Sequence, residues 1–318
     1  MSNAVKVIAI DHGNRNIKTT RHTFPASYVE SGHLPALGAD TIVLGEKEYV
    51  LVDKRMPQKN DKTMDDAYFI LTLFAIGKEL AEEMDNPVGE CVEITLLVGL
   101  PPLHCKKMGA GFAEYFKANG EPVTFTFNKL PFTISVKEVH VFPQAYAAAV
   151  TIYERVRDSR IINVVDIGGH TVDCMQLTEF TPDMATCTSL YGGVNSLFQR
   201  VNEQVRSSGA KDILDIVIEG ILQNDEKTLR DCSPERVALV KSTAVQFARD
   251  MLLKVSQEGL DMSENTTVFI GGGSILLREY ITTAGIAVKT MFVENVRANA
   301  DGYQLIYQNR KNPKKKNG

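Results

Sequence analysis

Short apolar, β-branched runs alternate along the chain with longer segments of helical period. Runs bounded by turn-forming residues predict strands. They cover residues 5–10, 93–98, 122–127, 132–141, 160–165, 172–178 and 266–270, with a hairpin over 41–52. Helical patterns cover residues 64–83, 106–119, 144–157, 194–206, 211–223 and 235–258. This alternation of strands and helices predicts an α/β protein.

The segment at residues 64–83 carries the clearest long amphipathic pattern. Asp65 and Asp66 stand where acidic residues favour a helix N-terminus, and Asn86-Pro87 is expected to end the helix. We interpret its apolar stripe as core rather than as an interface, because one stripe at helical spacing packs inside a domain in most globular proteins.

Two of the predicted strands end in the same short motif. A strand followed by Asp-x-Gly occurs at Asp11-His12-Gly13 and again at Asp166-Ile167-Gly168. The chain has 318 residues, and domains span about 100–200 residues each. The repeated motif and the length together predict two related halves rather than one long domain.

Composition and charge narrow the class of protein. With 44% hydrophobic and 23% charged residues the chain is ordinary for a globular protein. Its formal net charge of −4 gives no general reason to expect direct nucleic-acid binding. The basic segment at residues 310–316 is interpreted as a solvated tail.

Cysteine spacing and hydropathy bear on the compartment. The five cysteines form no Cys-x-x-Cys pair, so we expect reduced thiols and no structural zinc site. The N-terminus shows no signal-peptide pattern, and no apolar run approaches the roughly 20 residues that span a bilayer. We therefore expect a soluble, cytoplasmic protein that makes no contact with a membrane.

A magnesium nucleotide places specific demands on a protein. Its phosphates favour glycine, whose backbone N–H can approach closely; hydrated Mg²⁺ prefers carboxylates, and lysine supplies a compact positive charge. Asp11, Gly13 and Lys18 form one such set, with the spacing Asp-x-Gly-x-x-x-x-Lys. Residues 166–171, Asp-Ile-Gly-Gly-His-Thr, form a second, and Gly271-Gly272-Gly273 is a third glycine turn after a strand. Neither a P-loop nor a dinucleotide-binding glycine motif is present.

In order and spacing, these sets resemble the five signatures of the actin-like ATPase superfamily. The matching segments are residues 11–18 (phosphate-1), 142–145 (connect-1), 166–173 (phosphate-2), 269–274 (adenosine) and 298–303 (connect-2). Each motif alone is weak, but the ordered five cover nearly the whole chain. Within the superfamily, His-Thr-Phe-Pro-Ala-Ser at 22–27 and Leu-Val-Gly-Leu-Pro at 97–101 look like the bacterial plasmid-segregation actins of the ParM/StbA type.

The resemblance implies an α/β fold with two actin/Hsp70-type, ribonuclease H-like domains around a central nucleotide cleft. The first domain would comprise residues 1–147 and 292–318, with an inserted subdomain near 25–90. The second would comprise residues 148–291, with an inserted subdomain near 190–265. Closure of such a cleft couples the nucleotide state to domain movement.

The resemblance also implies roles for single residues. Asp11 and Asp166 would hold hydrated Mg²⁺ through water, and Lys18 would reach the phosphates. Gln144 would position the lytic water, and Gln144 and Asp166 would be the catalytic residues. The remaining nucleotide-binding residues would be Gly13, Asn14, Gly168, Gly169, Thr171, Gly192, Gly193, Gly271, Gly272, Gly273 and Ser274. Asn14 departs from the Ser or Thr that is common after the first glycine, but its amide can still donate to a phosphate.

Other polar residues near these motifs have less defined roles. His12 and His170 are interpreted as loop residues near phosphate, without partners for a metal site or a nucleophilic triad. Asp173 is an alternative holder of the second loop through hydrogen bonds to its backbone. Lys241 is a candidate contact for the base or ribose.

The implied function is a polymerising ATPase with ATP, or alternatively GTP, and Mg²⁺ as cofactors. Its partners would be further copies of itself and a DNA-binding adaptor of the ParR type, so that centromere-like plasmid DNA is contacted only indirectly. Two alternatives stay open: a small-molecule kinase on the same fold, and a bacterial cytoskeletal scaffold that takes no part in segregation. A kinase needs a catalytic carboxylate, and Gln144 cannot act as one.

Overall fold

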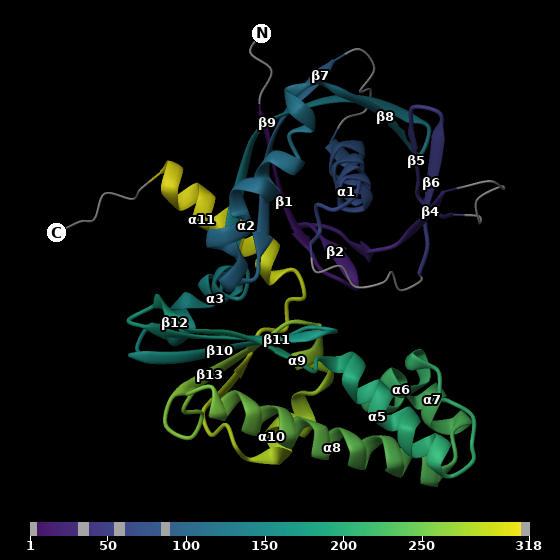
Figure 1. Ribbon diagram of the computed structural model, residues 1–318, viewed down its shortest axis with the longest axis vertical. Helices are drawn as coiled ribbons and strands as arrows, with labels where there is room; N and C mark the ends of the chain where they lie inside the picture. Colours follow the sequence, from purple (N-terminus) through teal and green to yellow (C-terminus); the bar gives the residue numbers. More distant parts are fainter. Residues whose placement is uncertain (1–4, 31–37, 54–60, 84–89, 313–318) are drawn as a thin grey trace. The chain divides into compact units, whose positions relative to one another are not determined.

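The computed structural model describes residues 5–30, 38–53, 61–83 and 90–312. The chain divides into two compact units, each with its own sheet and core. The first unit is Met1–Thr151 with Arg297–Gly318, and the second unit is Ile152–Val296. The α/β class predicted from the hydrophobic pattern is confirmed (Figure 1).

The described part of the first unit forms one nine-stranded sheet of order β3-β2-β1-β7-β9-β8-β5-β6-β4. Its strands are β1 (Lys6–His12), β2 (Asn16–Lys18), β3 (Thr23–Pro25), β4 (Tyr28–Glu30), β5 (Thr41–Leu44), β6 (Lys47–Leu51), β7 (Cys91–Leu100), β8 (Val123–Phe127) and β9 (Leu130–Pro143). Strands β1, β7 and β9 run parallel, and the other neighbours are antiparallel. Residues that follow the three parallel strands therefore meet at one edge of the sheet, where ligands bind in many α/β proteins.

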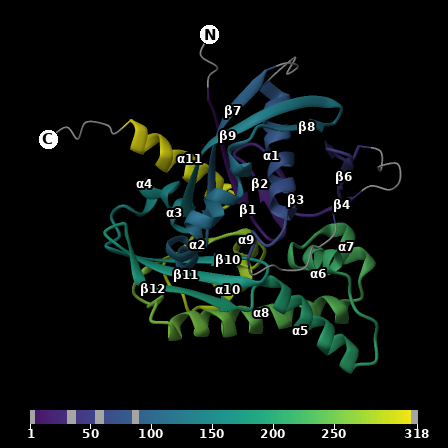
Figure 2. The same cartoon turned by 45° about the horizontal axis from the view of Figure 1, so that its top comes forward.

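The helices of the first unit are α1 (Ala67–Glu83), α2 (Pro102–Tyr115), α3 (Tyr146–Val150) and α11 (Ala298–Lys311), with a 3-10 turn, η1, at Ala118–Gly120. Figures 1 and 2 show α1 inside the curve of the sheet. Its middle turns are buried on every face, so the prediction of a core helix is confirmed. The polar, exposed face that an amphipathic helix would have is missing from these turns. The Asp65 carboxylate accepts from the N–H of Ala67 at 3.0 Å and so starts the helix. The predicted end at Asn86-Pro87 lies outside the described residues.

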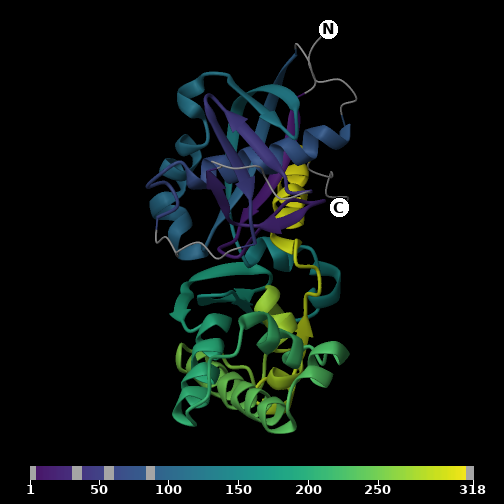
Figure 3. The same ribbon diagram turned by 90° about the vertical axis from the view of Figure 1, so that its right-hand side faces the viewer.

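In the second unit, the described strands form a five-stranded sheet of order β12-β11-β10-β13-β14. Its strands are β10 (Ile161–Ile167), β11 (Thr171–Thr178), β12 (Thr181–Tyr191), β13 (Thr266–Ile270) and β14 (Thr290–Phe292). The helices are α4 (Tyr153–Val156), α5 (Val194–Ser207), α6 (Asp215–Leu222), α7 (Glu226–Asp231), α8 (Pro234–Gln257), α9 (Gly272–Leu276) and α10 (Arg278–Ala284). Figure 3 shows α8 and its green neighbours as a layer along one face of the teal strands.

The two units repeat one strand topology. In β3-β2-β1-β7-β9 and in β12-β11-β10-β13-β14, the first three strands form an antiparallel meander and the last three run parallel. Asp11 lies near the end of β1, and Asp166 lies near the end of β10, the matching strand. The repeated Asp-x-Gly motif thus marks equivalent places in two related folds, as the sequence predicted.

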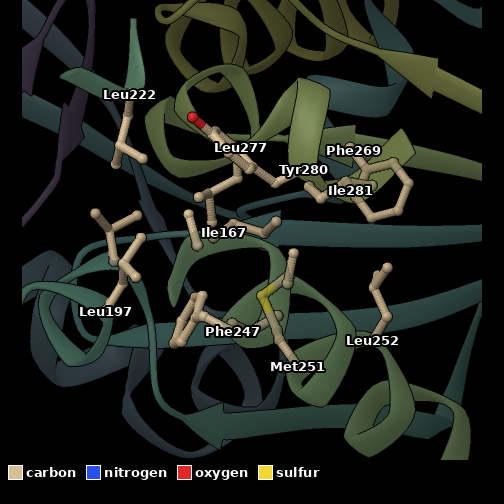
Figure 4. Close-up of a cluster of buried hydrophobic side chains, with 14 of the residues drawn as sticks. Ile167, Leu197, Leu222, Phe247, Met251, Leu252, Phe269, Leu277, Tyr280 and Ile281 are labelled. Atoms are coloured by element: carbon tan, nitrogen blue, oxygen red, sulfur yellow. The ribbon is translucent and has the colours of Figure 1, made fainter. Parts of the chain in front are cut away.

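The core of the second unit anchors the end of β10. Ile167 is fully buried among side chains of α5, α8 and α10, including Leu197, Phe247 and Ile281 (Figure 4). Side chains alternate between the faces of a strand, so Asp166 points to the opposite face from Ile167. Burial of the apolar neighbour therefore fixes the direction of the carboxylate.

One predicted helix is wrong and one strand was missed, each for an identifiable reason. The single helix over residues 144–157 is wrong, because the backbone breaks after α3 and Gln144 precedes the helix in a turn. Strand β12 was not predicted, since its hairpin turn uses Glu179 and Phe180 with positive φ of 49° and 62°. The usual sequence signal for such a two-residue turn is Asn-Gly or Asp-Gly, and this turn has neither.

Among the helices that the structure describes, none combines the length and the apolar character needed to pass through a bilayer.

Candidate functional site

A buried carboxylate lies at the centre of the candidate site in the first unit. Asp11 is only 2% exposed and accepts hydrogen bonds from two side chains. Gln144 Nε2 donates to its Oδ1 at 2.9 Å, and Lys18 Nζ pairs with its Oδ2 at 3.3 Å. A buried charge of this kind needs such partners, because burial without them is costly.

The sheet explains why these three residues meet. Asp11 and Lys18 are directly opposed in the β1–β2 hairpin. Gln144 follows β9, and its own N–H donates to the carbonyl of Leu100, the last residue of β7, at 2.8 Å. The three side chains thus come from the edge of the sheet where β1, β7 and β9 all end.

The orientation of the Gln144 amide follows from this network. An ionised carboxylate only accepts hydrogen bonds, so the Nε2 group must face Asp11. The amide oxygen, Oε1, is then the atom that can accept a hydrogen bond from another group. This is the arrangement required for orienting a water molecule beside a carboxylate.

Gly13 and Asn14 form the turn of the β1–β2 hairpin. A Cβ on Gly13 would lie 2.6 Å from the carbonyl oxygen of Asn16, so the turn has room only for glycine. The Asn14 side-chain oxygen accepts from the Tyr68 hydroxyl at 3.2 Å, which attaches the turn to α1. Asn14 therefore has its NH₂ group left as the donor that the sequence prediction required.

His12 is not the loop residue that the sequence suggested. Its ring is fully buried, stacks on Phe116 with centroids 4.9 Å apart, and bonds through Nε2 to the Thr72 hydroxyl at 2.7 Å. Burial lowers the pKa of His12 to about 3, with a further contribution from the Lys62 charge. The imidazole is therefore neutral at pH 7 and belongs to the core, and the interpretation of His12 as a phosphate neighbour is wrong.

In the second unit, Asp166 lies against the glycine turn that follows β13. A Cβ on Gly271 would be 2.3 Å from Asp166 Oδ1, and Gly271 has a φ of 88°, which also favours glycine. Helix α9 begins directly after this residue. A Cβ on Gly273 would lie 2.6 Å from the Ile167 carbonyl oxygen. The third predicted motif thus packs directly on the second.

Ser274 and Gly272 differ in their access to a ligand. Ser274 is fully buried, and its hydroxyl donates to the Gly271 carbonyl at 2.8 Å. Its position argues against the predicted contact with a nucleotide and gives it a role in shaping the turn. Gly272 is exposed, with nothing within 4 Å of a Cβ placed on it.

Gly168 and Gly169 form the tight turn between β10 and β11. The N–H of Gly168 donates to the Thr171 carbonyl at 2.9 Å. The N–H groups of Gly192 and Gly193 both donate to the His170 carbonyl at 3.0 Å. The backbone N–H groups of both glycines are thus used to hold the His170 loop, which argues against their predicted use as phosphate donors.

Side chains of β11, β12 and α5 form a second set of polar contacts beside this turn. Asp173 accepts from the Thr171 hydroxyl at 3.3 Å and from the hydroxyl of Ser189. His170 lies 3.1 Å, through Nε2, from the amide nitrogen of Asn195 on α5. Asp173 therefore joins β11 to β12 through side-chain hydrogen bonds, and its predicted bonds to the loop backbone stay a prediction. Ser189 and Asn195 carried no motif that could have identified them.

Lys241, on α8, is connected through Asn224, which lies between α6 and α7, to Glu279 on α10. Its ammonium donates to the side-chain oxygen of Asn224, whose NH₂ group lies 3.5 Å from Glu279 Oε2 on α10. Nothing in these contacts tests its predicted role near the base or ribose.

A pocket of about 210 Å³ lies on the second unit between β12, α5 and α8. It includes the ion pair of Arg200 with Asp250 and the neighbouring Lys254. Of the predicted site residues it contains Gly192, and it is therefore a feature apart from Asp166 and Gly271.

The metal prediction concerns carboxylates that act through water. In the described ranges, no cluster of three or more His, Cys, Asp or Glu residues is suited to hold a metal ion directly. Asp11 and Asp166 each lie beside a glycine turn, and Asp166 has Asp173 opposite it on β11. They fit a hydrated Mg²⁺, which keeps several of its waters, better than a directly ligated ion.

Comparison with solved structures identifies the fold. An archaeal actin homolog, Ta0583, in complex with ADP matches with a TM-score of 0.71 and 15% identity, over 95% of this chain and 99% of that one. The apo ParM protein of pSK41 matches with a TM-score of 0.70 and 14% identity, over 98% and 99%. A ParM filament from Clostridium botulinum matches with a TM-score of 0.72 and 19% identity, over 96% and 99%. The chain therefore has the actin-like, ParM-type fold. No protein-family model and no curated protein matches the sequence.

Proposed function

We propose that the chain is an actin-like ATPase that polymerises with ATP and Mg²⁺ and segregates plasmid DNA through an adaptor. The observation that carries the proposal is the network of Asp11, Lys18 and Gln144 at the ends of three parallel strands. Its counterpart is Asp166, packed on Gly271, at the matching strand of the second unit. Each of these two sets offers a carboxylate beside a glycine turn, which suits the hydrated Mg²⁺ and the phosphates of a nucleotide.

The residues present suit the separate parts of the ligand. The two carboxylates would accept hydrogen bonds from magnesium-bound water, and the Lys18 ammonium would shift from Asp11 to a phosphate oxygen. Bound magnesium would supply neutralisation of the phosphate charge. The turns at Gly13 and Gly169 would bring backbone N–H groups close to the phosphates, while the N–H of Gly168 closes the turn on the Thr171 carbonyl.

Gln144 supports hydrolysis rather than transfer to another substrate. With Nε2 held by Asp11, its Oε1 would accept a hydrogen bond from a water and orient that water for attack. A glutamine cannot remove the proton of an acceptor hydroxyl, as a kinase base does. A kinase would show ATP turnover that rises only when an acceptor is added.

The solved relatives support the polymerisation part of the proposal. The chain of a ParM filament and this chain match over nearly the whole length of both. The archaeal actin homolog, which has the same fold, is known in complex with ADP. Head-to-tail contacts between identical copies generate open helices. An acidic chain of net charge −4 fits the expectation that plasmid DNA is reached through a ParR-type adaptor.

Phosphate release tests the hydrolytic assignment. The Gln144→Ala variant should release phosphate at least about tenfold more slowly than the parent protein, with nucleotide affinity little changed. Gln246→Ala is the matched control, because Gln246 also donates to a carboxylate, Asp250, at 2.8 Å, but on the exposed face of α8. Equal rates for the parent and Gln144→Ala would refute the role of Gln144.

Polymerisation is tested by sedimentation and electron microscopy. Filaments are expected with ATP and Mg²⁺, and their disassembly is expected as phosphate is released. Filaments that form without phosphate release would favour the scaffold alternative. An absence of filaments across a wide range of protein and salt concentrations would refute polymerisation.

A further inference from the structure

The direction of Gln144 depends on an unusual turn at Ala145. The N–H of Tyr146 donates to the Gln144 carbonyl at 2.6 Å, two residues back. Ala145 between them has φ and ψ of 61° and −55°. These values define the rare, strained form of the γ-turn, which a residue with a Cβ avoids.

A side chain from the far end of the sequence holds this turn. Asn299, on α11, is 8% exposed, and its Oδ1 accepts from the N–H of Ala145 at 3.0 Å. Ala145 itself is 1% exposed, so its N–H has no access to water as an alternative partner. The bond thus satisfies a buried donor and fixes a strained backbone at once.

Helix α11 is a rigid support for Asn299. A Cβ on Gly302 would lie 1.9 Å from the Ala147 carbonyl oxygen, so α11 and α3 are packed backbone to backbone. One residue later, Tyr303 is fully buried with its hydroxyl directly over Gly99 of β7. These close contacts leave α11 little freedom to shift along α3.

We propose that Asn299 is a positioning residue for hydrolysis, which acts by holding the Ala145 turn and so aiming Gln144 at Asp11. The inference rests on the proposed ATPase function. Without the Asn299 acceptor, the strained turn loses its main support, and Ala145 relaxes toward ordinary helical backbone. Gln144 then leaves the carboxylate, although the Asp11 and Lys18 pair remains for nucleotide binding.

The first test replaces the acceptor. Asn299→Leu, of similar size, should lower kcat by about tenfold to a hundredfold, since small misplacements of catalytic groups have effects of that size. The dissociation constant for Mg-ATP should stay within about twofold to threefold. Asn299→Asp keeps an oxygen that can accept from the Ala145 N–H, so this variant should retain most of the parent kcat. A loss of affinity as large as the loss in kcat would overturn the inference.

The second test removes the strain instead. Glycine adopts positive φ without penalty, so Ala145→Gly added to Asn299→Leu should recover part of kcat. The matched control is Asn202→Leu, because the Asn202 oxygen also accepts from a backbone N–H, that of Ile213, at 2.7 Å. This control should lose stability while its folded fraction keeps the parent kcat. A double variant no faster than Asn299→Leu would contradict a role through the turn.

Hydrogen exchange separates this inference from the proposed function. The Ala145 amide should exchange at least about tenfold faster in Asn299→Leu than in the parent, whether or not the protein hydrolyses ATP. Unchanged exchange would refute the structural role of Asn299. A parent protein without ATPase activity would refute the proposed function and leave the exchange result to decide the role of Asn299 in the turn.

Discussion

Acid should destabilise the first unit through His12, the residue between Asp11 and Gly13. The ring lies in an apolar site against Phe116 and bonds through Nε2 to the Thr72 hydroxyl. Burial lowers its pKa from 6.5 to about 3. The unfolded chain therefore takes up a proton that the folded chain refuses, and the first unit loses stability as the pH falls below 6.5.

The size of the effect follows from the two pKa values. Stability is fully present above pH 6.5, and below it the loss approaches about 1.4 kcal/mol per pH unit until the pH nears 3. Between pH 7 and pH 5 this residue should cost about 2 kcal/mol of unfolding free energy. That is a large share of the stability of a typical domain.

Urea unfolding at both pH values measures the loss. The sequence contains no tryptophan, so a single Tyr49→Trp substitution in the first unit gives a fluorescence signal from that unit alone. His12→Gln provides the reference, because an uncharged amide can still donate to Thr72 and does not titrate. Taking the difference between the two proteins removes the contributions of the other titrating groups.

The comparison depends on the change with pH and not on the absolute stability of the variant. The parent should lose about 2 kcal/mol more than His12→Gln between pH 7 and pH 5. If both proteins lose the same amount, His12 is not held neutral by burial, and its description as a neutral core side chain is wrong.

Glycine substitutions test the tight turn at Gly271 and the close packing of α11 on α3. Gly271→Ala should weaken Mg-nucleotide binding at least about tenfold, because the new methyl meets the Asp166 carboxylate at 2.3 Å at a positive φ. Gly111→Ala, on α2 with open space around it, should bind normally in the same titration. Gly302→Ala should lower the unfolding free energy by about 3 kcal/mol or more, since its methyl would lie 1.9 Å from a backbone carbonyl of α3. The helical control Gly111→Ala, with no atom within 4 Å, should be neutral or stabilising by up to about 1 kcal/mol.

Much of the strand framework follows from local sequence. The run at residues 266–270 is β13 in full, because a short apolar, β-branched segment bounded by polar residues and glycine suits a buried strand. The motifs around Asp11 and Asp166 were predictable for the same reason, since each follows a strand of that kind. Their common topology then brings Asp11 and Gln144 together across 133 positions of sequence.

The parts that sequence could not predict depend on distant contacts. Ala145 looks like the start of an alanine-rich helix. Its positive φ is stabilised by the hydrogen bond that its N–H donates to the Asn299 side chain, far away in the sequence. His12 looks like a loop residue, and only the packing of α1 and α2 around it shows a neutral core side chain. Gly192 and Gly193 look like phosphate donors until the His170 carbonyl is seen to accept from both.

The proposed function requires that Asp11 and Asp166 both contribute to the binding of one magnesium nucleotide. Calorimetric titration of the full chain with ATP should give one site per chain that requires Mg²⁺. Either Asp11→Asn or Asp166→Asn should lower the affinity at least about tenfold, with little further loss in the double variant, since each removes a carboxylate that would hold the waters of the same Mg²⁺. Two ATP molecules per chain, or an affinity that one of these substitutions leaves unchanged, would contradict the claim.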